Sequence, residues 1–208
     1  MSGAHYIPIP LPEGKRLADL SGISQDLFSC RDYIQLFRSL CQTPHSGLNH
    51  QLIDCIVTTI FIRYGRALGS GARSPVQHEL KQIMTDADLA VHQMVMALRS
   101  KHFAHSVNAC ESPEITVSLS VGSPTRRVTS VSVGITKILA PDMFVFDNLQ
   151  ILVDKLHAWT ISEQKTESCR LLPIVEERYS LDELYSRIGQ SKKKRITYGD
   201  LSKTRNGT

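Results

Sequence analysis

The stretch Met94-Val-Met-Ala-Leu-Arg-Ser-Lys-His-Phe-Ala-His-Ser106 decides the predicted fold, because it ends the longest uninterrupted helical pattern in the chain. Apolar residues leading up to it recur every three or four positions, as one face of an α-helix requires. They are Leu80, Met84, Ala87, Val91, Met94 and Leu98. We expect one helix over residues 75–106, about 45 Å long at 1.5 Å per residue. A helix of that length projects beyond its neighbours or contacts a second subunit.

Basic side chains replace the apolar stripe near the end of this helix. His102 and His105 continue the stripe, and Arg99 lies beside Leu98 at the edge of the same face. One interpretation is structural, because a half-buried histidine often makes a single hydrogen bond in a core and cations near a helix C-terminus complement the helix dipole. The other is a functional site, because a guanidinium, an ammonium and two imidazoles fall within seven residues.

The spacing of Arg99 and His105 bears on how they could act together. Six positions correspond to about 240° around a regular helix, so the two side chains do not share a face. If both act on one substrate, the simplest arrangement is a twofold dimer that brings two copies of the stretch together. A purely structural alternative is that the same segment forms a polar seam between subunits.

Arg99, five intervening residues and His105 resemble the R-x4-6-H motif of the HEPN superfamily. The sequence Leu98-Arg-Ser-Lys-His-Phe-Ala-His-Ser106 is similar in particular to sequences of its abortive-infection-like branch. The superfamily comprises all-helical proteins, many of them metal-independent ribonucleases of toxin and phage-defence systems. The resemblance covers residues 24–160 in architecture and 98–106 in motif. It implies a mainly α, HEPN-like bundle that cleaves RNA through the 2′-hydroxyl of the substrate, without a cofactor.

The resemblance also implies roles for individual residues. Arg99 and His105 would be catalytic: the imidazole moves the proton, and the guanidinium holds the phosphoryl oxygens as negative charge builds on them. Lys101 and His102 would give secondary electrostatic help to substrate binding. This chain departs from the pattern at Ser100, where active members often carry Asn, Asp or His. The implied partners are a second copy of the chain, RNA, and an antitoxin or other regulatory protein.

Two further hypotheses follow from the same residues. A catalytically silent dimer of the same fold could bind RNA, a nucleotide or a protein partner. His102, His105 and Cys110 could instead supply three ligands of a zinc site, although no fourth ligand is evident in the sequence. A nucleoside-triphosphate loop is not indicated, because Gly65, Gly69 and Gly71 punctuate a helix end without the lysine that such a loop needs.

Length and composition predict one globular domain. The chain has 208 residues, of which 41% are hydrophobic and 21% charged. We expect an extended, proline-rich segment over residues 1–23, a helical-bundle domain over 24–190 and a flexible tail over 191–208. No run approaches 18 apolar residues, and the five cysteines are scattered, so we expect a cytoplasmic protein with reduced thiols and no membrane contact.

The basic charge belongs to the predicted tail. Residues 191–208 carry six lysines or arginines against Asp200, a net +5, whereas the whole chain is +4. The remaining 190 residues therefore sum to −1. Such a tail either contacts a polyanion without sequence preference or is simply a solvated terminus.

The remaining patterns predict more helices and one hairpin. We expect helices over about 25–42 and 49–68, another that begins at Asp147, and a short last helix from Ser180 to about Ile188. Between about 114 and 136 the period changes to two, which is typical of a β-hairpin with one apolar face. An isolated hairpin is marginal, so this one should pack on the helices or against a symmetry mate.

Overall fold

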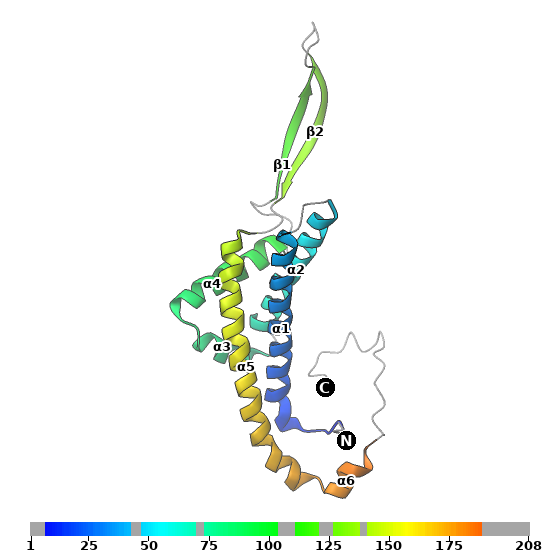
Figure 1. Cartoon of the computed structure of the whole chain (residues 1–208), viewed down its shortest axis with the longest axis vertical. Helices are drawn as coiled ribbons and strands as arrows, with labels where there is room; N and C mark the ends of the chain where they lie inside the picture. Colours follow the sequence, from blue (N-terminus) through cyan, green and yellow to red (C-terminus); the bar gives the residue numbers. More distant parts are fainter. Residues whose placement is uncertain are drawn as a thin grey trace.

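The computed structural model of the chain describes residues 7–42, 47–69, 73–103, 111–120, 127–137 and 141–188. It is mainly helical with one two-stranded antiparallel sheet, as the sequence predicts (Figure 1). The predicted tail lies outside the described residues. In chain order the elements are η1 (Pro12–Gly14), α1 (Lys15–Cys41), α2 (Gly47–Leu68), α3 (Ser74–Gln82), α4 (Asp86–Leu98), η2 (Arg99–Phe103), β1 (Glu111–Leu119), β2 (Val128–Lys137), α5 (Met143–Arg178) and α6 (Leu181–Ser186).

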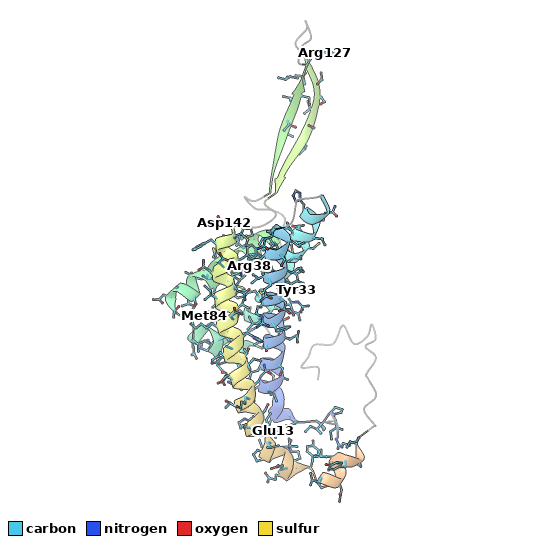
Figure 2. The ribbon with its side chains drawn as sticks, in the orientation of Figure 1. Glu13, Tyr33, Arg38, Met84, Arg127 and Asp142 are labelled. Carbon is cyan, nitrogen blue, oxygen red and sulfur yellow. The ribbon has the colours of Figure 1, made fainter. Side chains whose placement is uncertain are left out.

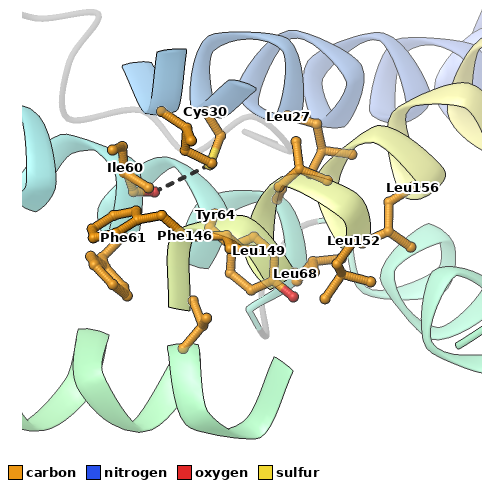
Figure 3. Close-up of a cluster of buried hydrophobic side chains, with 14 of the residues drawn as sticks. Leu27, Cys30, Ile60, Phe61, Tyr64, Leu68, Phe146, Leu149, Leu152 and Leu156 are labelled. Carbon is orange, nitrogen blue, oxygen red and sulfur yellow. Dashed lines mark hydrogen bonds between the residues drawn. The ribbon is translucent and has the colours of Figure 1, made fainter. Parts of the chain in front are cut away.

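The long helices α1 and α5 lie side by side and antiparallel, and α1 also packs along α2 (Figure 1). Their shared core is aliphatic and aromatic (Figure 3). The ring of Phe146 on α5 lies 4.4 Å from that of Phe37 on α1 and 6.1 Å from that of Phe61 on α2, measured between centroids. Burying rings of this size supplies much of the hydrophobic stabilisation. The core therefore joins α1, α2 and α5.

Helix α1 begins at Lys15, ten residues before the predicted start at Gln25. Its first turns belong to the core, because Leu20, Ile23 and Leu27 are all fully buried. The predicted extended segment over 1–23 is therefore wrong from Pro12 onward. Leu20, Ile23 and Leu27 are spaced by three and four residues, so the sequence carried the helical signal that our prediction overlooked.

The predicted single helix over 75–106 is wrong, because the chain turns between α3 and α4. The side chain of Thr85 accepts a hydrogen bond from the backbone N–H of Asp88, and the Thr85 backbone N–H donates to the Asp88 carboxylate. This capping box begins a new helix at Asp86. The stretch of α-helix after the turn is therefore only 13 residues long.

The turn also changes which face of α4 is buried. His92 is 8% exposed and Val95 is fully buried, while Met94 of the predicted stripe is 37% exposed. Asp86 and Gln93 of α4 are exposed, and so are four small or flexible apolar residues at helical spacing: Ala87, Ala90, Met94 and Ala97. We call these four apolar residues the outer α4 face. An apolar helix face that the described residues leave exposed can accept a partner.

The hairpin forms as predicted, over Glu111–Leu119 and Val128–Lys137, and it extends away from the bundle (Figure 1). In the register, Ile115 pairs with Val133 and Val117 with Val131, so these apolar side chains share one face. Each is between 55% and 73% exposed, and Figure 2 shows the strands standing clear of the helices. Packing on the bundle, one of the two expected arrangements, is therefore wrong for these residues. Contact with a symmetry mate stays a prediction.

None of the helices among the described residues is long and apolar enough to cross a membrane.

Candidate functional site

Arg99 lies where α4 ends and a π-helical turn begins. The α-helical pattern stops at Leu98, and residues Arg99–Phe103 form the wider turn η2. The expectation that the α-helix continues to Ser106 is therefore wrong, and the 240° separation of a regular helix does not apply after Leu98. Single π turns inside helices occur frequently at functional sites. His105 lies outside the described residues, and for His102 only the backbone is described.

The side chain of Arg99 crosses α2 at Gly65. A Cβ atom added to Gly65 would lie 3.1 Å from Arg99 Nε, 3.3 Å from Cγ and 3.4 Å from Cδ. The missing side chain at Gly65 therefore provides the space that Arg99 occupies. Arg99 Nε is buried, and no described residue accepts a hydrogen bond from it. A buried donor without a protein partner costs free energy unless water or a ligand accepts its proton.

A buried tyrosine–histidine pair lies beside this arginine. Tyr64, which precedes Gly65 on α2, shares a hydrogen bond with His92 of α4, with 3.1 Å between Oη and Nδ1. His92 and Arg99 are seven residues apart and project from the same side of α4. The pair therefore fixes α4 against α2 at the level from which Arg99 extends.

Burial keeps the Tyr64–His92 pair uncharged. Desolvation lowers the pKa of His92, and Lys81 lowers it further. Desolvation also raises the pKa of Tyr64, assisted by Cys30 and Asp88. Both groups are therefore neutral near pH 7, and their hydrogen bond joins two neutral partners. This pair has a structural role in holding the two helices.

We expect the free energy of unfolding to fall as the pH drops from 7 to about 5.5. The folded chain holds the pKa of His92 below 6.5, so in this range the unfolded chain binds more protons than the folded one. His157, whose pKa burial also lowers, adds a contribution of the same sign. Asp88 and Glu167 have lowered pKa values and respond only at more acidic pH. The free energy of unfolding, measured by urea denaturation at several pH values in this range, should depend less steeply on pH in His92→Gln than in wild type. An unchanged dependence on pH would contradict the contribution of His92.

The other predicted site residues differ in exposure. Ser100 is half-buried and Lys101 is exposed on η2. Arg99 therefore contacts the bundle while Lys101 extends from it. Cys110 of the zinc alternative lies outside the described residues, among which no three His, Cys, Asp or Glu side chains gather as a metal site would require. The four described cysteines, Cys30, Cys41, Cys55 and Cys169, are free thiols.

Comparison with known proteins found no matching family model, no matching curated protein and no matching solved structure. The site is therefore defined by its own geometry. Sequence reasoning identified Arg99 but missed Gly65, Tyr64 and His92. Gly65 offered a usable signal, because a glycine within an apolar helix often marks the close approach of another segment. The pairing of Tyr64 with His92 had no such signal.

Proposed function

We propose that this protein is a metal-independent endoribonuclease of the HEPN type that acts as a homodimer. The single observation that carries the proposal is the placement of Arg99. It lies at the end of the helix that bears the R-x4-6-H pattern, held over Gly65, with a buried Nε that no described residue satisfies. An arginine held in this way is suited to a phosphate, whose oxygens match the guanidinium fork.

The proposed reaction is an in-line transfer at a phosphodiester. The 2′-oxygen attacks phosphorus while the 5′-oxygen leaves, which yields a 2′,3′-cyclic phosphate and a free 5′-hydroxyl. His105 takes the proton from the 2′-hydroxyl, and a proton returns to the leaving 5′-oxygen, because an imidazole near its pKa serves as base and acid. Arg99 stabilises the charge on the phosphoryl oxygens. Lys101, His102 and Ser100 assist in holding the substrate.

The outer α4 face supports a second copy of the chain as partner. Ala87, Ala90, Met94 and Ala97 are exposed on the same helix that ends in Arg99. Small side chains let two helices approach closely, and a twofold axis would set this face against itself. Such a dimer would bring two copies of Arg99 and His105 into one cleft. The exposed apolar face of the hairpin is a second surface that the dimer could cover.

The biological setting belongs to the same proposal. The proposed catalytic residues act on the RNA backbone, which is the same in every RNA, so the cleavage needs control. We therefore propose a toxin or phage-defence role with an antitoxin or other regulatory protein as partner. The substrate implies a cytoplasmic location. The tail at 191–208, with its net charge of +5, would add contacts to the RNA backbone.

The direct test is incubation of purified protein with single-stranded RNA in EDTA. The proposal predicts fragments that end in a 2′,3′-cyclic phosphate, identified by mass spectrometry. The competing function, which the departure at Ser100 favours, is a silent dimer that only binds. Truncation after residue 190 separates the two: the silent module would bind RNA through its tail, lose that binding when truncated, and cut in neither form.

Gly65→Ala should impair cleavage more than stability. The added methyl group would lie 3.1 Å from Arg99 Nε, so the guanidinium must shift, and small displacements of a catalytic group are costly. Alanine is the better helix former by about 1 kcal/mol, which offsets part of the crowding. We expect a loss of about tenfold in kcat/KM with little change in Tm. Gly14→Ala, where the added atom would be 3.7 Å or more from its neighbours, is the matched control. Equal activity of the two variants would contradict the role of Gly65.

A further inference from the structure

Three arginines converge on one buried carboxylate on the side of α2 that faces α1. Asp26 of α1 is 2% exposed. Its Oδ1 accepts a hydrogen bond from Arg63 Nη1 at 3.0 Å, and its Oδ2 accepts one from Arg73 Nη1 at 3.0 Å. The Nε atom of Arg66 lies 3.6 Å from Oδ2. Arg63, Arg66 and Arg73 therefore form a cluster, which we call the triple-arginine cluster.

The triple-arginine cluster carries more positive charge than the carboxylate needs. A buried carboxylate must be paired, but one well-placed guanidinium can satisfy both of its oxygens. Three guanidinium groups against one carboxylate leave a surplus of two positive charges. Asp19 is also on α1, but it lies seven residues from Asp26, about two helical turns away, and pairs with Lys15 at 3.0 Å. Packing around Asp26 therefore does not by itself explain three arginines.

The cluster has donors that reach solvent. The side chains of Arg63, Arg66 and Arg73 are 33%, 55% and 20% exposed. Each guanidinium has five N–H donors, whereas the two oxygens of Asp26 already accept from Arg63 and Arg73. The remaining N–H groups can therefore bind a second anion on the solvent side.

Arg73 is held in place by a close approach to α1. A Cβ atom on Gly22 would lie 2.7 Å from Arg73 Nη2 and 2.8 Å from its Cζ, so the guanidinium rests directly on the helix backbone. Arg73 is also the N-cap residue of α3, where the helix dipole is positive. A cation at that position adds to the surplus charge. An arginine that is fixed against such repulsion is prepared to bind an anion without reorganising.

We propose that Arg63, Arg66 and Arg73 form a binding site for a phosphate group. The planar forks of three arginines suit its tetrahedral oxygens, and Asp26 orients two of those forks. The phosphate could belong to an RNA backbone or to free phosphate. Arg66 directly follows Gly65, over which Arg99 lies, so an RNA strand that reaches Arg99 could also pass the triple-arginine cluster. In that case the site rests on the proposed function and extends it.

The test compares full-length wild type with Arg66→Gln and Arg31→Gln. Arg66 is the most exposed member, and its removal leaves both 3.0 Å bonds to Asp26 intact. Arg31 of α1 is the matched control, since its side chain is 31% exposed and its nearest acid is Asp32 at 3.7 Å. Arg66→Lys, which keeps the charge, reports on the need for the fork. Circular dichroism checks that all four proteins are folded.

The first arm measures binding of fluorescent 2′-O-methyl RNA, which cannot be cut through its own 2′-hydroxyl, at several salt concentrations. We expect Arg66→Gln to weaken binding about three- to tenfold and to lower the salt slope by about one, and Arg31→Gln to have no effect. The second arm measures the rise in Tm with inorganic phosphate against potassium chloride at equal ionic strength. We expect a smaller rise for Arg66→Gln than for Arg31→Gln.

The outcomes separate the two sources of phosphate. A loss in the RNA arm assigns the site to the RNA backbone, and a loss in the phosphate arm alone assigns it to free phosphate. If Arg66→Gln matches Arg31→Gln in both arms, the proposed site is overturned. Neither arm depends on cleavage, so a failure of the nuclease proposal is distinguishable from a failure of this site.

Discussion

Arg99→Ala should lower the rate of RNA cleavage by about 100-fold or more, because removing one donor to a developing oxyanion typically costs that much. The alanine variant also loses the stem that packs on Gly65. Arg99→Lys should recover only part of the activity, since an ammonium cannot make two parallel hydrogen bonds to a phosphoryl group. Single-turnover cleavage of end-labelled RNA in EDTA measures both variants, and His105→Ala should be similarly impaired.

Arg178→Ala is the control for this prediction. Arg178 pairs with Glu13 near the end of α5, far along the chain from α4, and its loss removes the same charge. It should cut at nearly the wild-type rate. If Arg99→Ala and His105→Ala cut as fast as wild type, the observed activity comes from a contaminant, and the assignment of both residues fails.

Met94→Glu should convert a dimer to monomers and abolish most of the cleavage. Met94 is exposed in the single chain, so the variant can fold, but in a dimer the carboxylate would be buried in an apolar contact without a partner. If the site is shared between subunits, we expect cleavage to fall by about 100-fold as the dimer dissociates. Light scattering after size exclusion gives the mass, and the same samples are assayed for cleavage.

Leu172→Glu is the matched control, because Leu172 is also an exposed apolar residue but lies near the C-terminal end of α5. It should remain dimeric and active. A Met94→Glu protein that stays dimeric would exclude the outer α4 face as the contact. A monomeric Met94→Glu protein that cuts like wild type would show that one chain contains the whole site.

Strong periodicity made several elements predictable from sequence. The apolar stripe of α2 gives one solution, because rotating the helix would expose its apolar side chains. The strict alternation of both strands has a period of two, which fits a strand and not a helix. Helix α4 was different. Its larger apolar residues lie on several sides of the helix: Leu89, Val91, Val95 and Leu98. The pattern therefore did not specify which face is buried.

The break before α4 was predictable in principle. Thr85 and Asp88 have the spacing of a capping box, but the apolar residues continue across the turn and favoured one long helix. The turn also affects the candidate site. Met94 is exposed and His92 is buried, whereas a single long helix would have buried Met94. A local capping signal thus outweighed a longer periodic pattern.

Contacts between distant segments could not be predicted. His92 lies 28 residues from Tyr64, and Asp26 lies 37 and 47 residues from Arg63 and Arg73. Nothing in a single sequence specifies which polar residues meet across helices at such separations. The sequence therefore identified the chemical character of Arg99, while the packing that orients it became visible only in the fold.

The most direct test uses a heterodimer with Arg99→Ala in one copy and His105→Ala in the other, co-expressed with different tags and purified through both. If each of the two catalytic sites in the shared cleft takes its guanidinium from one chain and its imidazole from the other, one of the two sites is intact, and activity should be about half that of wild type. Activity as low as that of the two parent homodimers would contradict a shared site.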